Sequence, residues 1–208
     1  DAEARPNAVK HYDYSRKYII WSVEQSLKNL CTDYLDFLLL HRPSPLLEPD
    51  EVLEAISRLV KEGKIKNFGV SNFSSSQIEM LETAIPVSAN QVEFSLTSNK
   101  VMYDGTLDDC KANKRMGMSW SPLGAYFKED TPQVKRIKKA IQSLMEKYEA
   151  SADQLLLAWI LKHPAKVHPV VGTATKSRLK DALAATKIDL ELQDWFLLLE
   201  ASQGHEVP

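Results

Sequence analysis

Short apolar runs alternate with longer segments of helical period along the chain. Five of the short runs are bounded by polar or turn-forming residues, which is the pattern of β-strands. They cover residues 34–40, 65–70, 89–94, 117–121 and 167–171. The first run is rich in leucine around Phe37, and we expect it to be covered on both faces, as parallel strands usually are.

The segments on either side of the first run predict amphipathic helices at residues 16–30 and 50–62. Each places its apolar side chains on one stripe. The stripes consist of Ile19, Ile20, Val23, Leu27 and Leu30 in the first helix, and of Val52, Leu53, Ile56, Leu59 and Val60 in the second. Pro49 stands where a first-turn proline is favoured, and Gly63 is placed to end the second helix.

Capping-box spacing marks two further helix starts, at Ser74 with Gln77 and at Ser151 with Gln154. The helix after the second box is apolar almost all round and should be buried. Further helices are expected at residues 153–162, 176–186 and 193–202, and another amphipathic helix is marked by Ile137, Ile141, Leu144, Met145 and Tyr148.

The predicted order is one helix followed by β-α-β-α-β-α-β-α-α-β-α-α. Such alternation favours parallel strands joined by right-handed crossovers. An open doubly wound sheet would carry GxGxxG after its first strand, and this chain with seven glycines lacks that motif. The sequence therefore predicts an α/β fold, a (β/α)8 TIM barrel. Because it supplies five of the strands, we expect the others to precede Asp1.

Composition narrows the possible partners. The formal net charge of −2 gives no electrostatic basis for binding nucleic acid or a membrane surface. No run of about 18 apolar residues is present, so no spanning helix is expected. Cys31, Cys110 and the scattered histidines show no metal-ligand spacing, so we expect free thiols and no metal site. The free thiols favour a reducing compartment, so we expect a cytoplasmic protein. We also expect a monomer or weak homo-oligomer.

Five motifs resemble, in order and at similar spacing, strands four to eight of the aldo-keto reductase family, with bacterial members the most similar. Together they cover the whole chain and imply that residues 1–208 form a single barrel domain of that family, without its first three strands. The motifs are DYLDFLLLHRP ending strand four, GVSNF for strand five, ANQVE for strand six, SWSPLG for strand seven and PVVGT for strand eight.

The resemblance implies that His41, at the end of the fourth strand, orients a substrate carbonyl. It implies that Ser71, Asn72 and Gln91 hold the carboxamide of a nicotinamide, to which amide side chains offer both donors and acceptors. Simpler interpretations are a strand-end histidine bonded to backbone, a strand-to-helix cap at residues 71–72 and a core amide at Gln91.

The same resemblance implies a nicotinamide stacked on Trp120 and a dinucleotide held by the loop that follows it. The cofactor implied is NADP(H), because the guanidinium of Arg178 is suited to a 2′-phosphate. The cofactor-binding residues are Trp120, Ser121, Pro122, Leu123, Gly124, Gly172, Thr173, Lys176, Arg178 and Asp181. A core aromatic and a solvated arginine are the simpler interpretations of Trp120 and Arg178.

Three departures from the family pattern are visible. Gly172 stands where many members have a lysine, Ala182 stands where many have an asparagine, and the loop after Gly124 is short. The first weakens the NADP preference and the second puts an adenine contact in doubt. The short loop implies faster exchange of the dinucleotide.

The implied activity is reduction of an aldehyde or ketone to an alcohol, with hydride from the nicotinamide and a proton from a tyrosine paired with lysine and aspartate. That tyrosine, lysine and aspartate are expected upstream of Asp1, and no role is carried to Tyr12, Tyr14 or Lys17. Two alternatives remain open. One is a nicotinamide-binding regulatory subunit with little turnover, and the other is an inactive truncated reductase.

Overall fold

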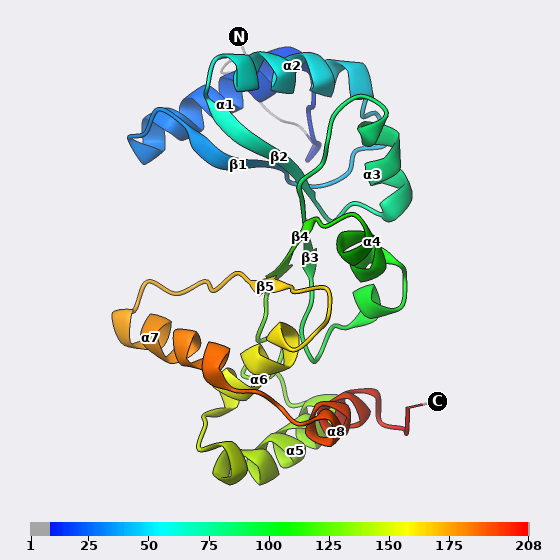
Figure 1. The fold of residues 1–208 in the computed structure, drawn as a ribbon, viewed down its shortest axis with the longest axis vertical. Coiled ribbons are helices and arrows are strands. Elements are labelled where there is room, and N and C mark those ends of the chain that lie inside the picture. Colours follow the sequence, from blue (N-terminus) through cyan, green and yellow to red (C-terminus); the bar gives the residue numbers. More distant parts are fainter. Residues whose placement is uncertain (1–8, 208) are drawn as a thin grey trace. The chain divides into compact units, whose positions relative to one another are not determined.

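A computed structural model of the protein describes residues 9–207. Their contacts divide the chain into two compact units, Asp1–Asn90 and Gln91–Pro208, with the boundary inside the third strand. Figure 1 shows the chain coloured along its length. The predicted single domain over residues 1–208 stays a prediction.

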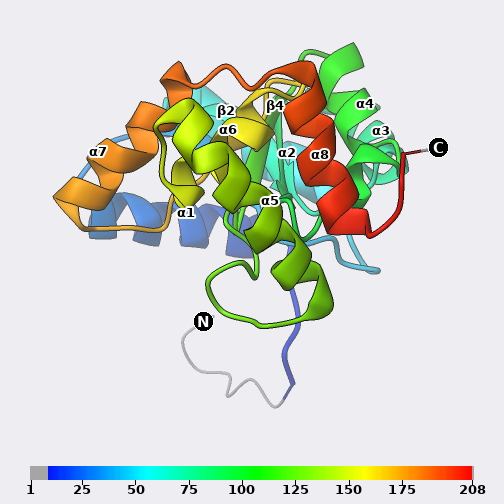
Figure 2. The same cartoon turned by 90° about the horizontal axis from the view of Figure 1, so that it is seen from below.

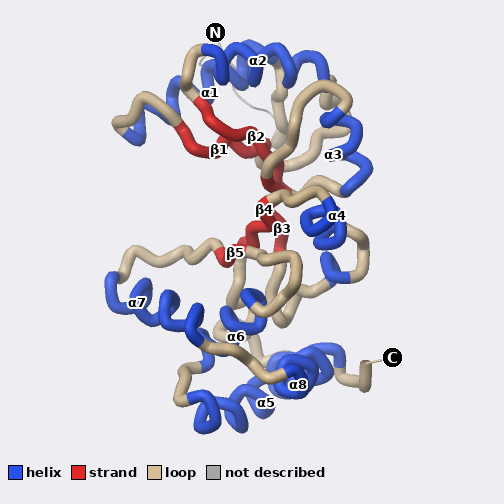
Figure 3. The backbone as a smooth tube through the Cα atoms, viewed as in Figure 1, coloured by secondary structure: helices blue, strands red, loops and turns tan. Residues whose placement is uncertain are grey.

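The first unit alternates helices and parallel strands. Strands β1 and β2 are paired in register with Leu35 opposite Ile65 and Leu40 opposite Val70, and the strand order is β1-β2-β3. Figure 3 shows these strands in red, with α1 and α2 side by side near them. The elements are α1 (Arg16–Leu30), β1 (Leu35–Leu40), α2 (Pro49–Lys61), β2 (Ile65–Ser71), α3 (Ser75–Glu82) and the start of β3 (Ala89–Glu93).

Most of the expected helix starts and ends are confirmed. Pro49 is the first residue of α2, and Gly63 follows that helix in the left-handed region with φ 71°. The Ser74–Gln77 capping box forms at α3, with both of its hydrogen bonds. The prediction of a buried apolar stripe was wrong at two residues, because Leu30 is 64% exposed and Val60 is 48% exposed. Leu30 is the last residue of its helix, and Val60 lies one position beyond the buried Leu59.

The core of the first unit lies between these helices and one face of the sheet. It contains Val52, Ile56 and Leu59 of α2 and Leu40 of β1, all buried. The prediction that β1 is covered on both faces was wrong, because Leu40 is its only buried residue. Alternate residues of a strand face opposite sides, and the half-buried Phe37 and Leu39 belong to neither apolar cluster of the described residues.

The second unit has strand order β3-β4-β5, and β4 and β5 are parallel with Ser119 opposite Pro169. Figure 2 shows α5 and α8 lying side by side. The elements after β3 are the 3₁₀ helix η2 (Lys100–Met102), α4 (Thr106–Ala112), β4 (Met116–Trp120), α5 (Pro132–Tyr148), α6 (Ala152–Leu161), β5 (His168–Pro169), α7 (Lys176–Ala184), the 3₁₀ helix η3 (Ala185–Lys187) and α8 (Leu192–Gln203).

The last strand is shorter than the predicted run of residues 167–171. Pro169 has no backbone N–H, so it cannot donate a hydrogen bond to the neighbouring strand β4. One more bond follows it, from Val170 N to Ser119 O at 2.8 Å, and β5 then ends.

Helix α6 is the centre of the second core. The expected burial of this helix is confirmed, because Leu155 to Ile160 are all buried. Trp159 stacks on Trp195 of α8 with ring centroids 5.0 Å apart, and each indole N–H donates to the other residue's backbone oxygen. This pair fixes α6 against α8. Within the described residues, no helix is long and apolar enough to cross a membrane.

Gly69 is required by the close approach of three strands. A Cβ at this position would lie 2.6 Å from Leu39 Cδ2 and 2.8 Å from the backbone oxygen of Ala89. We expect Gly69→Ala to lower the free energy of unfolding by about 1–3 kcal/mol, the usual cost of overpacking. Urea unfolding measures it, and Gly117→Ala is the matched control, since its new Cβ would be 3.5 Å from the nearest atom. Equal losses in both variants would contradict the packing argument.

His163, after α6, predicts an acid sensitivity. Burial against the ring of Phe94 lowers its pKa below the ordinary 6.5, an effect that Lys111 reinforces and Asp108 opposes. Below pH 6.5 the unfolded chain binds a proton that the folded chain resists. Stability should therefore be full above pH 6.5 and fall as the pH drops towards the lowered pKa. Urea midpoints at several pH values should fall less on acidification in His163→Gln, and parallel curves would refute this assignment.

Candidate active site

The carboxyl ends of β1 and β2 bring three predicted residues together. His41 directly follows β1, Ser71 is the last residue of β2, and Asn72 follows it. Asn72 Nδ2 lies 2.8 Å from Ser71 Oγ and 3.5 Å from the backbone oxygen of His41, and it donates to both. The parallel register therefore assembles a small polar group at one sheet edge, which is where this class of fold carries its chemistry.

The environments of these three residues differ. Ser71 is 2% exposed, Asn72 is half-buried, and His41 is exposed. Asn72 has φ 63°, in the left-handed region that asparagine tolerates better than most residues. The exposed imidazole is thus available to a ligand, and the turn beside it is held by an amide side chain.

Two tyrosines ahead of α1 also lie at this edge, and the sequence interpretation gave them no role. Tyr14 donates to the backbone oxygen of Arg42 at 2.5 Å and accepts from the backbone nitrogen of Arg42 at 3.1 Å. The ring of Tyr12 stands edge-on to the imidazole of His41, with centroids 5.8 Å apart, and stacks on Tyr14 at 6.2 Å. A tyrosine spacing of two was the only sequence sign of this pair.

In the second unit, the turn after β4 is tight and includes two residues with positive φ. Ser121 has φ 50° and Gly124 has φ 54°, and Gly124 N donates to Ser121 O at 2.8 Å. A Cβ at Gly124 would collide with Thr97 Oγ1 and would lie 2.5 Å from Ser95 Oγ. Thr97 Oγ1 also accepts from Ala125 N at 3.0 Å. Only glycine fits here, and Thr97 and Ser95, which sequence reasoning missed, shape the turn.

The other predicted residues of this turn are placed as follows. Trp120, which ends β4, is half-buried, as is Leu123, while Pro122 is buried and Ser121 is exposed. Leu123 packs against the core of the second unit. Gln91 lies half-buried on β3. The turn is therefore anchored by its apolar residues and exposes its polar one.

The predicted phosphate-binding residues follow β5, the neighbour of β4. Gly172 has nothing within 4 Å of the Cβ it lacks, so the backbone there is open to a ligand. Thr173 Oγ1 accepts from Thr175 N at 3.2 Å, just before α7. Lys176 and Arg178 lie in the exposed first turn of α7, where the helix N-terminus also favours an anion.

Asp181 lies farther along α7, with its side chain exposed. Its backbone oxygen accepts from Gln154 Nε2 at 3.2 Å, which ties α7 to the start of α6. No described group of His, Cys, Asp or Glu side chains is arranged to hold a metal ion.

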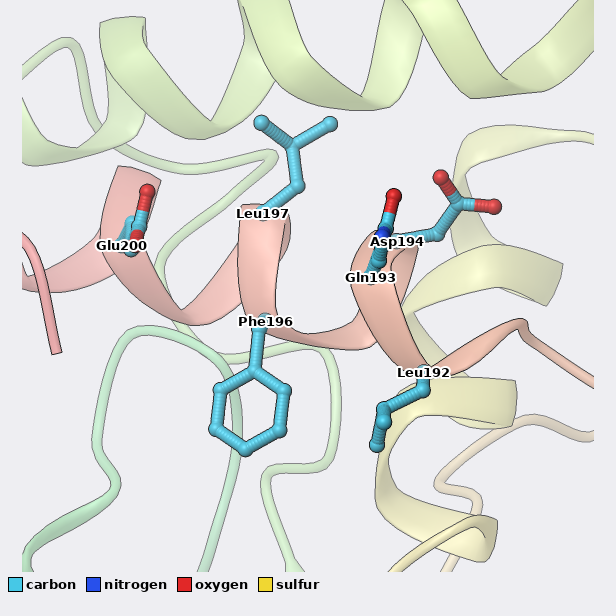
Figure 4. Close-up of a pocket in the computed structure, with 6 residues that line it drawn as sticks. All are labelled: Leu192, Gln193, Asp194, Phe196, Leu197 and Glu200. Atoms are coloured by element: carbon cyan, nitrogen blue, oxygen red, sulfur yellow. The ribbon is translucent and has the colours of Figure 1, made fainter.

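A hollow on α8 contains none of the predicted residues. Figure 4 shows that Leu197 and Phe196 point to opposite sides of this helix, so the side chains do not converge on a ligand. The hollow is lined by Leu192, Gln193, Asp194, Phe196, Leu197 and Glu200.

A cluster of tyrosine, lysine and aspartate joins α5 to α8, but its chemistry is structural. Asp194 accepts from Lys147 Nζ at 2.7 Å and from the hydroxyl of Tyr148, whose oxygen accepts from Glu191 N at 2.8 Å. Burial and the Asp194 hydrogen bond raise the pKa of Tyr148, so this phenol is a poor acid. Burial opposes ionisation of Asp194, yet the bonds from Lys147 and Tyr148 hold its pKa below the ordinary value.

Parallel strands joined by helices define an α/β protein, and the sequential strand order β1-β2-β3-β4-β5 is that of a barrel and not of a doubly wound sheet. The sequence model described as "Aldo/keto reductase family" matches residues 5–202. The chain belongs to this family of carbonyl-reducing oxidoreductases. The match spans nearly the whole chain and does not itself restrict it to the C-terminal part of the family, so the restriction to strands four to eight stays a prediction.

Named relatives agree with this assignment. The uncharacterized oxidoreductase YcsN of Bacillus subtilis is 42% identical over 203 residues, which are 95% of this chain and 68% of that protein. An NADPH-dependent alpha-keto amide reductase of Saccharomyces cerevisiae is 30% identical, over 88% of this chain and 61% of its own length.

A solved structure gives the same fold. The crystal structure of the thermostable aldo-keto reductase Tm1743 with the inhibitor epalrestat has a TM-score of 0.82 and 28% identity. The similarity covers 90% of this chain and 67% of that one. Family and neighbour together imply a (β/α)8 barrel, and the five parallel strands described here are consistent with it.

The structural role of the α5–α8 cluster is testable. We expect Asp194→Asn to lower the Tm by about 2–4 °C, since it removes a charge-assisted contact at a site with little solvent. Carbonyl turnover should not change. The matched control is Asp189→Asn, because Asp189 pairs with Lys162 while 85% exposed, and such pairs contribute little. Loss of turnover in Asp194→Asn at full folding would mean that the cluster takes part in the reaction.

Proposed function

We propose that the protein is an NADP(H)-dependent aldo-keto reductase that reduces aldehydes or ketones to alcohols. The observation that carries this proposal is the group at the ends of β1 and β2. There the Asn72 amide donates to Ser71 Oγ and to the backbone oxygen of His41, whose side chain is exposed. The name of the yeast NADPH-dependent relative supports the choice of cofactor.

The residues of the second unit fit a dinucleotide in their chemistry. The turn from Ser121 to Gly124 is closely packed at a glycine, and the backbone at Gly172 is open. Arg178 and Lys176 offer two positive charges in the first turn of α7. A guanidinium at a helix N-terminus is suited to a phosphate group, such as the 2′-phosphate of NADP.

A bound nicotinamide would supply the hydride for the carbonyl carbon. His41 would donate a hydrogen bond to the carbonyl oxygen and so orient it. Ser71, Asn72 and Gln91 would hold the carboxamide, and Trp120 would stack on the ring.

We further propose that the five strands are the fourth to eighth of one barrel domain, with the proton-donating tyrosine, its lysine and an aspartate contributed from outside residues 1–208. These residues alone would then show no turnover. The proposed setting is the cytoplasm, with a small carbonyl compound as the substrate and with the protein a monomer or weak homo-oligomer.

Cofactor binding to the full-length protein gives the first test. NADPH should quench tryptophan fluorescence more strongly than NADH at equal concentration, because Trp120 lies at the nicotinamide and Arg178 at the 2′-phosphate. We expect Arg178→Ala to raise the Kd for NADPH at least about tenfold, as loss of a charge-assisted phosphate contact costs 1.4 kcal/mol or more. The Kd for NADH should change little.

Lys180→Ala is the matched control, because it removes one positive charge from an exposed position of the same helix. If both variants weaken NADPH equally, the effect is general electrostatics and Arg178 is not the phosphate ligand. Binding of NADPH without turnover of any aldehyde or ketone would favour a regulatory nicotinamide-binding subunit.

A further inference from the structure

The strand end that carries His41 is held from two sides. On one side, Asn72 Nδ2 donates to the backbone oxygen of His41 at 3.5 Å. On the other, the Tyr14 hydroxyl donates to Arg42 O and accepts from Arg42 N. Tyr14 and Arg42 are 28 residues apart in sequence, so this is a tertiary contact made through a single phenol oxygen.

A hydroxyl that both donates to and accepts from one residue's backbone restricts that residue strongly. Both bonds must be satisfied together, so Arg42 has little freedom to rotate about its own dihedrals. Burial of Tyr14 raises the pKa of its phenol despite the opposing bond from Arg42, so the group keeps its proton at neutral pH. The ring of Tyr14 also packs against the apolar core of the first unit, which anchors the hydroxyl.

The imidazole itself has an aromatic neighbour. The Tyr12 ring meets His41 edge-on, with an interplanar angle of 82° and centroids 5.8 Å apart. Tyr12 in turn stacks on Tyr14 at an interplanar angle of 14°. A continuous series of contacts thus links the core to Tyr14, Tyr14 to Tyr12, and Tyr12 to the exposed imidazole of His41.

We propose that Tyr12 and Tyr14 are positioning residues for His41. Tyr14 fixes the peptide that follows His41, and Tyr12 restricts the rotation of its imidazole. This inference rests on the proposed role of His41 as the group that orients the substrate carbonyl. It gives the segment ahead of α1 a function in the reaction, exercised without contact with the reacting atoms.

The main variant is Tyr14→Phe in the full-length protein, which removes only the hydroxyl. Tyr12→Leu is the second variant, since it removes the aromatic contact with the His41 imidazole. Tyr18→Phe is the matched control, because Tyr18 lies on the exposed side of α1 and contacts Trp21. Urea unfolding of each variant establishes that it is folded.

The first readout is steady-state kinetics with NADPH and an aldehyde that the parent protein reduces. We expect kcat to fall about tenfold in Tyr14→Phe and severalfold in Tyr12→Leu, with the KM for NADPH unchanged. Tyr18→Phe should match the parent protein. A fall in stability without this selective loss of kcat would mean that the tyrosines serve the fold alone.

The second readout does not require activity. The ¹H–¹³C NMR signal of the His41 ring, identified by its loss in His41→Gln, should shift in Tyr14→Phe and in Tyr12→Leu and stay in place in Tyr18→Phe. An unmoved His41 signal in every tyrosine variant that urea unfolding shows to be folded overturns the positioning role. Unchanged turnover in His41→Gln would instead refute the proposed function, whatever the NMR result.

Discussion

The in-register pairing of parallel strands is the constraint on which the candidate site depends. Leu40 lies opposite Val70 in the first unit, and so the next residue of each segment, His41 after β1 and Ser71 at the end of β2, reaches the same edge. In the second unit Ser119 lies opposite Pro169, which brings the turn after β4 next to the segment that leads to α7. A slip of one residue would send each of these side chains to the other face. The residue at which each strand ends therefore determines which side chains lie at the common edge of the sheet.

The chain leaves two of these strands through strained backbone. Asn72 and Ser121 both adopt positive φ directly after β2 and β4, a conformation that costs non-glycine residues of the order of 1 kcal/mol or more. Each of the two turns is held by a side chain from elsewhere in its unit or from the turn itself. Asn72 bonds to the neighbouring strand end, and Thr97 accepts from Ala125 N. The cost is consistent with turns that must present specific groups rather than merely reverse the chain.

Much of the fold could be predicted from the sequence, because helix periodicity and helix caps depend on residues close together in the chain. Helix periodicity gave α1, α2 and α6 close to their observed bounds, and the capping boxes at Ser74 and Ser151 were confirmed, since their partners are three residues away. The extent of β5 could not be predicted, because an apolar run does not show where backbone pairing ends. Contacts over long separations were equally hidden. The Tyr14–Arg42 bonds and the Thr97–Ala125 bond each join residues 28 positions apart, and no periodic pattern marks them.

The packing around Gly124 has a consequence for how this protein can diverge. Any side chain at that position would overlap the hydroxyls of Ser95 and Thr97, which come from the segment after another strand. Substitutions at these three positions are consequently expected to be coupled in evolution. A homologue that replaced Gly124 by alanine would need smaller or displaced groups at both of the other sites, so the two loops should vary together from one lineage to the next, even though nearly thirty residues separate Gly124 from each of its two neighbours.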